Sequence, residues 1–301
     1  MNIIRSQSPV ALGMGLMLVG MLMFALNDTM GKWLVSSYSL SQILFIRSTA
    51  AFVILAPAFW RHRGQLLTSP KPGLQSARAI LSTAEVASFY FVVGFMPLAD
   101  AMTYWLAAPI YVAALSPILL KEKVGWRRWS AIAVGFLGVV IALQPGAASF
   151  GLPALLALAG SAAFAFMMIS GRQLRDTPDI VLVFWQVVSA GVAGLVFLPW
   201  QWSSIQSGFD LGMLCLLGVV ASAAHLLVNR ALKLADAATV VPLQYTLLLW
   251  AMLFGWIFFD DIPKPATLVG AALIVAAGLY IFFRENRLRK KRPPEVLEPA
   301  P

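Results

Sequence analysis

Three ionisable side chains, Arg47, Glu85 and His225, lie within long apolar segments of this sequence. A charge in such a segment is costly in lipid, so each residue must line a polar cavity or pair with another group. Glu85 could hold the ammonium group of a substrate or carry a proton, and a static ion pair with Arg47 is the competing interpretation. His225 could relay protons or contact a carboxylate, whereas a neutral, hydrogen-bonded interior histidine is the more ordinary role.

Aromatic and small side chains form a second candidate surface. Tyr104, Ala108 and Tyr111 lie on one face of a helix, and this combination suits the wall of a pocket. Buried aromatic rings can stack on a planar or cationic substrate, although ordinary helix packing explains the same residues. Four further residues at membrane depth complete the candidate substrate-binding set: Tyr90, Trp185, Gln244 and Tyr245.

Proline interrupts two apolar segments at nearly corresponding places, as Pro109 and Pro242. Proline removes a helix hydrogen bond. In lipid, such a break needs support from neighbouring helices, and it can form a hinge or expose carbonyl groups to a cavity. We therefore expect residues 99–120 and 236–259 to line the site or to move.

Other acidic and amide residues have simpler interpretations. Asn27 and Asp28 are expected near the end of the first apolar segment, hydrated at the membrane interface. Asp100 and Asp236 stand at the starts of their helices, where a carboxylate caps free backbone N–H groups and meets the positive end of the helix dipole. These two residues are therefore expected to be structural.

The elements that carry these residues are membrane-spanning helices. The chain has 301 residues, of which 60% are apolar and 12% charged, whereas a soluble domain is about 25% charged. Lipid must therefore cover most of its surface. A span needs about 20 apolar residues, and the sequence predicts an all-α polytopic protein of about ten spans. The expected spans are 10–31, 41–59, 75–95, 99–120, 127–144, 152–170, 180–199, 210–229, 236–259 and 266–283.

The net charge of +9 follows the topology of these spans and does not indicate nucleic-acid binding. The basic residues cluster in every second loop and in a run after the last span, which is the bias of cytoplasmic segments. Only Lys32 and Lys264 fall in the other loops, and Arg47 lies within a span. Both termini are therefore predicted to be cytoplasmic.

The chain also repeats itself. Leu98-Ala-Asp-Ala-Met-Thr103 recurs as Leu234-Ala-Asp-Ala-Ala-Thr239, and upstream Gly20, Phe24 and Gly31 recur as Gly160, Phe164 and Gly171. The repeats predict two units, 9–146 and 152–284, followed by a basic and then disordered tail at 285–301. Each unit holds an odd number of spans, so the second enters the membrane inverted. Inverted repeats are typical of secondary transporters, with the substrate near the midplane between the halves.

This arrangement resembles the EamA family of the drug/metabolite transporter superfamily. The resemblance rests on the duplicated Leu-Ala-Asp-Ala segments and on an acidic residue that closes each of those spans, Glu122 and Asp261. It covers residues 10–283 and is nearest in character to YddG-type exporters of aromatic amino acids. It implies export of amino acids or related metabolites across a bacterial inner membrane.

The expected function is therefore export of amino acids, with aromatic ones as one option, by alternating access. A broad drug or metabolite exporter is the nearest rival, followed by a membrane enzyme that uses Glu85 and His225, and by a non-transporting scaffold. The sequence has no phosphate-binding G-x-x-x-x-G-K-[ST] loop and no H-E-x-x-H or G-x-S-x-G motif, which argues against an ATPase and against common hydrolases. With two histidines and one cysteine, no metal or other cofactor is expected. About ten helices can enclose a pathway unaided, so a monomer would suffice.

Overall fold

In the computed structural model, every regular element within the described residues is a helix. The described residues are 9–68, 70–95, 97–106, 108–121, 125–143, 151–260 and 265–290. The helices of the first half are α1 (Pro9–Val35), α2 (Leu40–Arg61), α3 (Arg63–Leu66), α4 (Pro72–Val93), α5 (Leu98–Trp105), α6 (Ala108–Leu119) and α7 (Trp126–Leu143). Those of the second half are α8 (Leu152–Gln173), α9 (Asp179–Gln201), α10 (Gly208–Leu234), α11 (Ala237–Val240), the 3₁₀ helix η2 (Val241–Tyr245), α12 (Thr246–Phe259) and α13 (Pro265–Lys290).

Five of these helices, α1, α2, α8, α9 and α10, are long and apolar enough to cross a membrane. Each matches a predicted span to within a few residues. The apolar sequence requires this form, because only a helix satisfies its own backbone hydrogen bonds in lipid. α13 continues to Lys290, past the predicted start of the tail at residue 285. The last residues of the tail, which were predicted to be disordered, lie outside the described part of the chain.

Local signals set several helix starts. The side chain of Ser39 accepts a hydrogen bond from the Gln42 amide and caps α2. Ser207 caps α10 in the same way, by accepting from the amide of Asp210. α4 begins at Pro72, where the missing N–H of proline costs nothing.

Glu122 and Asp261, predicted to close two spans, lie outside the described residues.

Two of the predicted spans are broken helices. α5 ends at Trp105 and α6 begins at Ala108, next to Pro109. In the second half, α11 gives way to η2, which contains Pro242, before α12 begins. Both interruptions thus lie beside the prolines that the sequence singled out.

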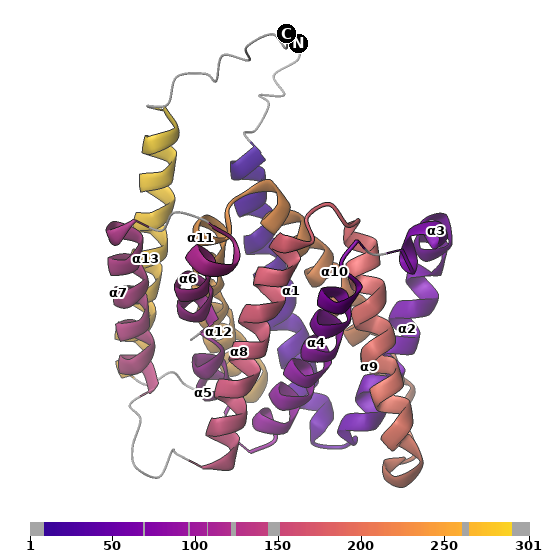
Figure 1. Ribbon diagram of the computed structural model, residues 1–301. Helices are drawn as coiled ribbons and strands as arrows, with labels where there is room; N and C mark the ends of the chain where they lie inside the picture. Colours follow the sequence, from indigo (N-terminus) through magenta and orange to yellow (C-terminus); the bar gives the residue numbers. More distant parts are fainter. Residues whose placement is uncertain are drawn as a thin grey trace, which may run out of the picture.

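The helices pack as one bundle with two outlying pairs (Figure 1). α1 packs along α10, and α4 packs along α8. α2 and α9 lie together at one side of the bundle, whereas α7 and α13 lie together at the opposite side. The start of α1 and the end of α13 are at the same end of the bundle.

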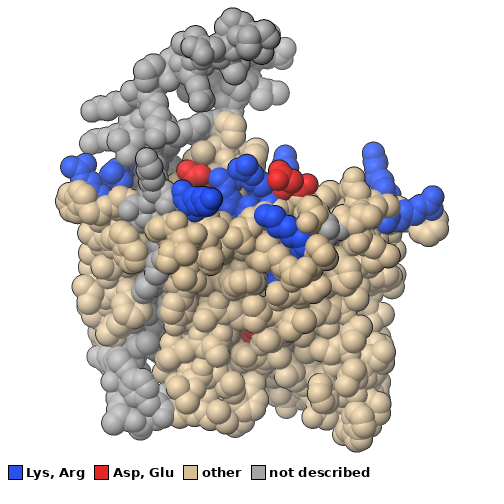
Figure 2. Space-filling view, viewed as in Figure 1, with Lys and Arg blue, Asp and Glu red and all other residues tan. Residues whose placement is uncertain are grey.

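Lysine and arginine gather at that same end, as Figure 2 shows. We call it the basic end. The long side wall visible in this view is mostly uncharged, and large apolar side chains such as Val53, Phe197 and Trp256 are exposed. An uncharged, apolar side wall below a basic rim is the surface expected of a protein embedded in lipid.

Candidate functional site

A cavity lies inside the bundle between α1, α2, α4, α5, α8, α10 and α12. Its free space is about 30 Å³, enough for about one or two water molecules. The polar residues that line it are Asn27, Asp28, Arg47, Glu85, Tyr90 and His225. Its aromatic residues are Phe24, Phe89, Trp105 and Phe164. We call this space the central cavity.

The charged residues of the central cavity are held by aromatic hydrogen-bond partners. Arg47 Nη1 donates to the hydroxyl oxygen of Tyr90 at 2.5 Å. Trp105 Nε1 donates to Glu85 Oε1 at 2.8 Å. Arg47 and Glu85 are both buried, and the hydrogen-bond partner of each is an aromatic side chain. Each charge is therefore fixed by its own neighbour and still faces a shared cavity.

Asn27 and Asp28 are buried and line the same cavity. The expectation that they would be hydrated at an interface was wrong. α1 runs on to Val35, so both residues lie well inside the helix rather than at its end. Asn27 Nδ2 donates to Asp28 Oδ1 at 3.1 Å. The cavity therefore holds two carboxyl groups and one guanidinium among its described residues.

His225 closes the cavity on the α10 side. Its ring meets Phe24 edge to face, with ring centres 4.9 Å apart. Its Nδ1 lies 3.5 Å from Gln186 Nε2, and that amide also donates to Ser82 Oγ at 2.9 Å. The histidine is thus packed on an aromatic ring and joined to a short polar chain, with one face on the cavity.

Glycines give the two aromatic partners their positions. A Cβ atom on Gly31 would lie 2.3 Å from the Tyr90 ring, and one on Gly160 would lie 2.5 Å from the Trp105 ring. Both distances are too short for carbon atoms in contact. Only glycine therefore lets these rings reach Arg47 and Glu85, and the two glycines belong to the repeated residues of the sequence.

The remaining predicted site residues lie elsewhere in this structure. Trp185 faces a groove between α2, α4 and α9, and its Nε1 donates to the carbonyl of Leu66 at 2.8 Å. Gln244 is buried with its Nε2 3.1 Å from the sulfur of Met168, and the buried Tyr245 ring packs on Gly135. Three others pack in or against the apolar core: Tyr104, Ala108 and Tyr111.

Sequence reasoning missed the aromatic walls. Phe24 meets Phe164 with ring centres 6.0 Å apart, and Phe89 meets Trp105 at 5.0 Å. Their rings surround carboxyl and guanidinium groups in a space that excludes most water. Such an arrangement can hold a cationic or planar group on the rings while charges orient its polar end.

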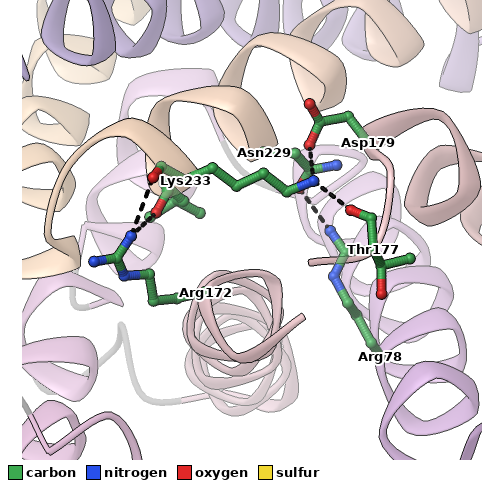
Figure 3. A network of polar contacts seen from close by, with 7 residues as sticks. Arg78, Arg172, Thr177, Asp179, Asn229 and Lys233 are labelled. Atoms are coloured by element: carbon green, nitrogen blue, oxygen red, sulfur yellow. Dashed lines mark hydrogen bonds and ion pairs between the residues drawn. The ribbon is translucent and has the colours of Figure 1, made fainter. Parts of the chain in front are cut away.

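Polar contacts fasten the bundle on both sides of the central cavity. At the basic end, Lys233 pairs with Asp179 at 2.6 Å (Figure 3), and Arg172 pairs with Asp236 at 2.9 Å. At the opposite end, Tyr38 donates to Asp210 Oδ2 at 2.8 Å and Gln42 Nε2 donates to the Ser203 carbonyl at 2.8 Å. The central cavity thus lies between two sets of polar contacts and has little free space.

The Trp105–Glu85 hydrogen bond has a measurable consequence. We expect Trp105→Phe to lower the free energy of unfolding by about 1–3 kcal/mol, because a buried carboxyl group loses its donor. Denaturant unfolding in mixed micelles measures this change. Trp200→Phe is the control, since Trp200 is 78% exposed and should shift by less than about 0.5 kcal/mol. Equal shifts in the two variants would show that the hydrogen bond contributes nothing.

Several proteins of known type are similar to this chain over nearly its whole length. It is 24% identical to an S-adenosylmethionine uptake transporter of Rickettsia felis over 93% of this chain and 95% of the relative. It is 26% identical to a riboflavin transporter of Rhizobium johnstonii over 90% of each chain. It is 25% identical to a pseudopaline exporter of Pseudomonas aeruginosa over 86% of this chain and 91% of the relative.

The fold is known from solved structures. One crystal structure superposes with a TM-score of 0.73 at 18% identity and covers 93% of this chain and 98% of its own. The sequence profile of the EamA-like transporter family matches the chain twice, at residues 11–144 and 151–283. The two matches together cover nearly all of the chain, and the relatives are transporters of small molecules. The chain therefore belongs to the EamA-like transporter family and is a multi-pass membrane transporter.

Proposed function

We propose that this protein is a secondary transporter of a bacterial inner membrane that exports amino acids or closely related metabolites by alternating access. The observation that carries the proposal is the central cavity, where Asp28, Arg47 and Glu85 meet although all three are buried in apolar helices. Charges at such depth are costly and are typical of substrate and ion pathways.

The arrangement of the helices supports inverted halves around this cavity. α1 and α8 begin the two matched segments, and α4 and α10 follow at corresponding places. The contact of α1 with α10 and that of α8 with α4 are therefore the same contact formed twice. With α5 and α6, and α11 with η2 and α12, each counted as one broken span, we infer ten spans with the basic end cytoplasmic.

The substrate we propose is a zwitterion with an aromatic or otherwise planar part. Asp28 and Glu85 are suited to its ammonium group, Arg47 with Tyr90 to its carboxylate, and the rings of Phe89 and Trp105 to its planar part. His225 and Glu85 are the candidates for proton coupling. The breaks beside Pro109 and Pro242 are the proposed hinges.

A second candidate is uptake of a cationic metabolite of the S-adenosylmethionine type. The observation that favours it is the excess of carboxyl groups over guanidinium groups among the described residues of the cavity. Ionised, the two carboxyl groups leave a net negative site, which suits a substrate that carries an extra positive charge. Relatives of this chain are named for uptake as well as for export, so direction has to be measured.

Transport into proteoliposomes tests the proposal. The purified protein is reconstituted and offered labelled phenylalanine, threonine, S-adenosylmethionine or a cationic dye, with and without a pH gradient. We expect saturable uptake of phenylalanine that unlabelled phenylalanine competes away and that empty vesicles lack. Uptake of S-adenosylmethionine alone would favour the second candidate. If folded, inserted protein moves none of these compounds, the amino-acid proposal is wrong.

A further inference from the structure

A line of polar residues on α10 leads from the central cavity to the basic end. His225 lines the cavity, and Asn229 and Lys233 follow at intervals of four residues along the same helix face. Each has a partner on another helix. Within the described residues, this face of α10 therefore carries polar side chains from the cavity to the basic end. We call it the polar route.

Arg78 of α4 meets this route at its middle step. The residue is 1% exposed, and its Nη2 donates to Asn229 Oδ1 at 2.9 Å. Its Nε and Nη1 atoms are buried and have no hydrogen-bond partner among the described residues. A buried guanidinium is expensive unless its donors are satisfied. A neutral amide alone does not compensate this charge.

Next to it along α10, Lys233 fastens the route to α9. Lys233 Nζ pairs with Asp179 Oδ1 at 2.6 Å and donates to the carbonyl of Thr177. Figure 3 shows Lys233 extending from α10 to these two residues and Arg78 reaching from α4 to Asn229. We call the Lys233–Asp179 pair the latch.

The charges around this point favour an anion. Asp179 is bound by Lys233, and Asp236 is bound by Arg172, which also donates to the Leu232 carbonyl at 2.8 Å. Asp179 also attracts the Arg78 guanidinium, so three cations, Arg78, Arg172 and Lys233, share these two acids. Gly171 of α8 packs beside the Arg78 guanidinium, and an added Cβ atom there would lie 3.9 Å from Arg78 Nε.

We propose that Arg78 is a second binding site, separate from the central cavity, which takes an oxyanion of a transported metabolite on the basic side when the latch opens. The oxyanion is a carboxylate or a phosphate, whose oxygens accept hydrogen bonds from unpartnered donors of the guanidinium. This inference rests on the proposed transport function. During alternating access, the anionic group of the substrate would move between Arg47 in the central cavity and Arg78 near the basic end.

Arginine labelling tests the site without any transport assay. Purified full-length protein in micelles is treated with p-hydroxyphenylglyoxal, and modification of each arginine is measured by peptide mass spectrometry. We expect slow modification of Arg78 in the unaltered protein. Lys233→Gln and Asp179→Asn should each accelerate it about fivefold, as expected from the loss of a partly exposed ion pair. Arg63, which lies in the exposed α3, is the internal control and should react at one rate throughout.

The anion is tested in the same experiment. Acetate or inorganic phosphate, against chloride at equal ionic strength, should slow modification of Arg78 in the latch variants about threefold at twice the dissociation constant. If the latch variants accelerate modification of Arg78 but neither anion slows it, the oxyanion site is wrong. If Arg78 is modified at the same rate in the unaltered protein and in the latch variants, the Lys233–Asp179 pair does not control access to Arg78. Protection in a protein that moves no compound would leave this site standing while the transport proposal fails.

Discussion

Replacement of Arg47 by glutamine is expected to abolish transport and to weaken substrate binding about 100-fold or more. Arg47 is the guanidinium of the central cavity and faces two carboxyl groups, Asp28 and Glu85. Its removal leaves buried acidic groups without a cation, and breaking a buried charge arrangement costs about 3–5 kcal/mol. The substrate also loses the partner proposed for its carboxylate. Uptake into proteoliposomes and equilibrium binding of the transported compound measure the two effects.

The matched control is Arg63→Gln. Arg63 is exposed in α3 and stacks over the ring of Trp60 with its guanidinium carbon 4.6 Å from the ring centre, so its loss should leave transport within about twofold. Arg47→Lys should retain a small part of the activity, because lysine keeps the charge but lacks the planar fork that reaches Tyr90. If Arg47→Gln is folded and transports normally, the charges of the central cavity do not bind the substrate.

Gly218→Ala is expected to disrupt the bundle. A Cβ atom at this position would lie 1.8 Å from the carbonyl oxygen of Arg47, where α10 crosses α2. Backbone atoms cannot move aside as a side chain can, so the two helices would have to separate. Overpacking of this kind costs about 1–3 kcal/mol or more, and it would also displace Arg47. The midpoint of denaturant unfolding and the yield of folded protein measure the effect.

The control lies on the same helix. Gly212 has no atom within 4 Å of an added Cβ, so Gly212→Ala should stabilise the protein by about 0.5–1 kcal/mol, because alanine loses less backbone entropy in a helix. The two substitutions therefore make the same chemical change with effects of opposite sign. A Gly218→Ala protein as stable as the unaltered one would mean that α2 and α10 do not cross this closely.

The sequence by itself determined the helical class, the five long apolar helices and three of the ionisable residues that line the central cavity. These follow from composition and position alone, since a run of apolar residues must be helical in lipid and a charge within it needs a polar environment. Arg47, Glu85 and His225 could therefore be found without coordinates. Asp28 could also have been found by the same rule, if the end of the first helix had been placed at Val35.

Only the tertiary structure decided which way each helix faces. An apolar helix in lipid has no clear polar stripe to show its inner side, so Tyr104 and Tyr111 could not be told apart from Trp105, which faces the central cavity. Trp185 was predicted for the site and lies in a groove on the other side of α4. The same limit hid Arg78, whose position near the start of α4 marks it as an ordinary cytoplasmic charge. Its burial against Asn229 depends on how α4 and α10 pack, and residues so far apart in the chain meet only in the folded bundle.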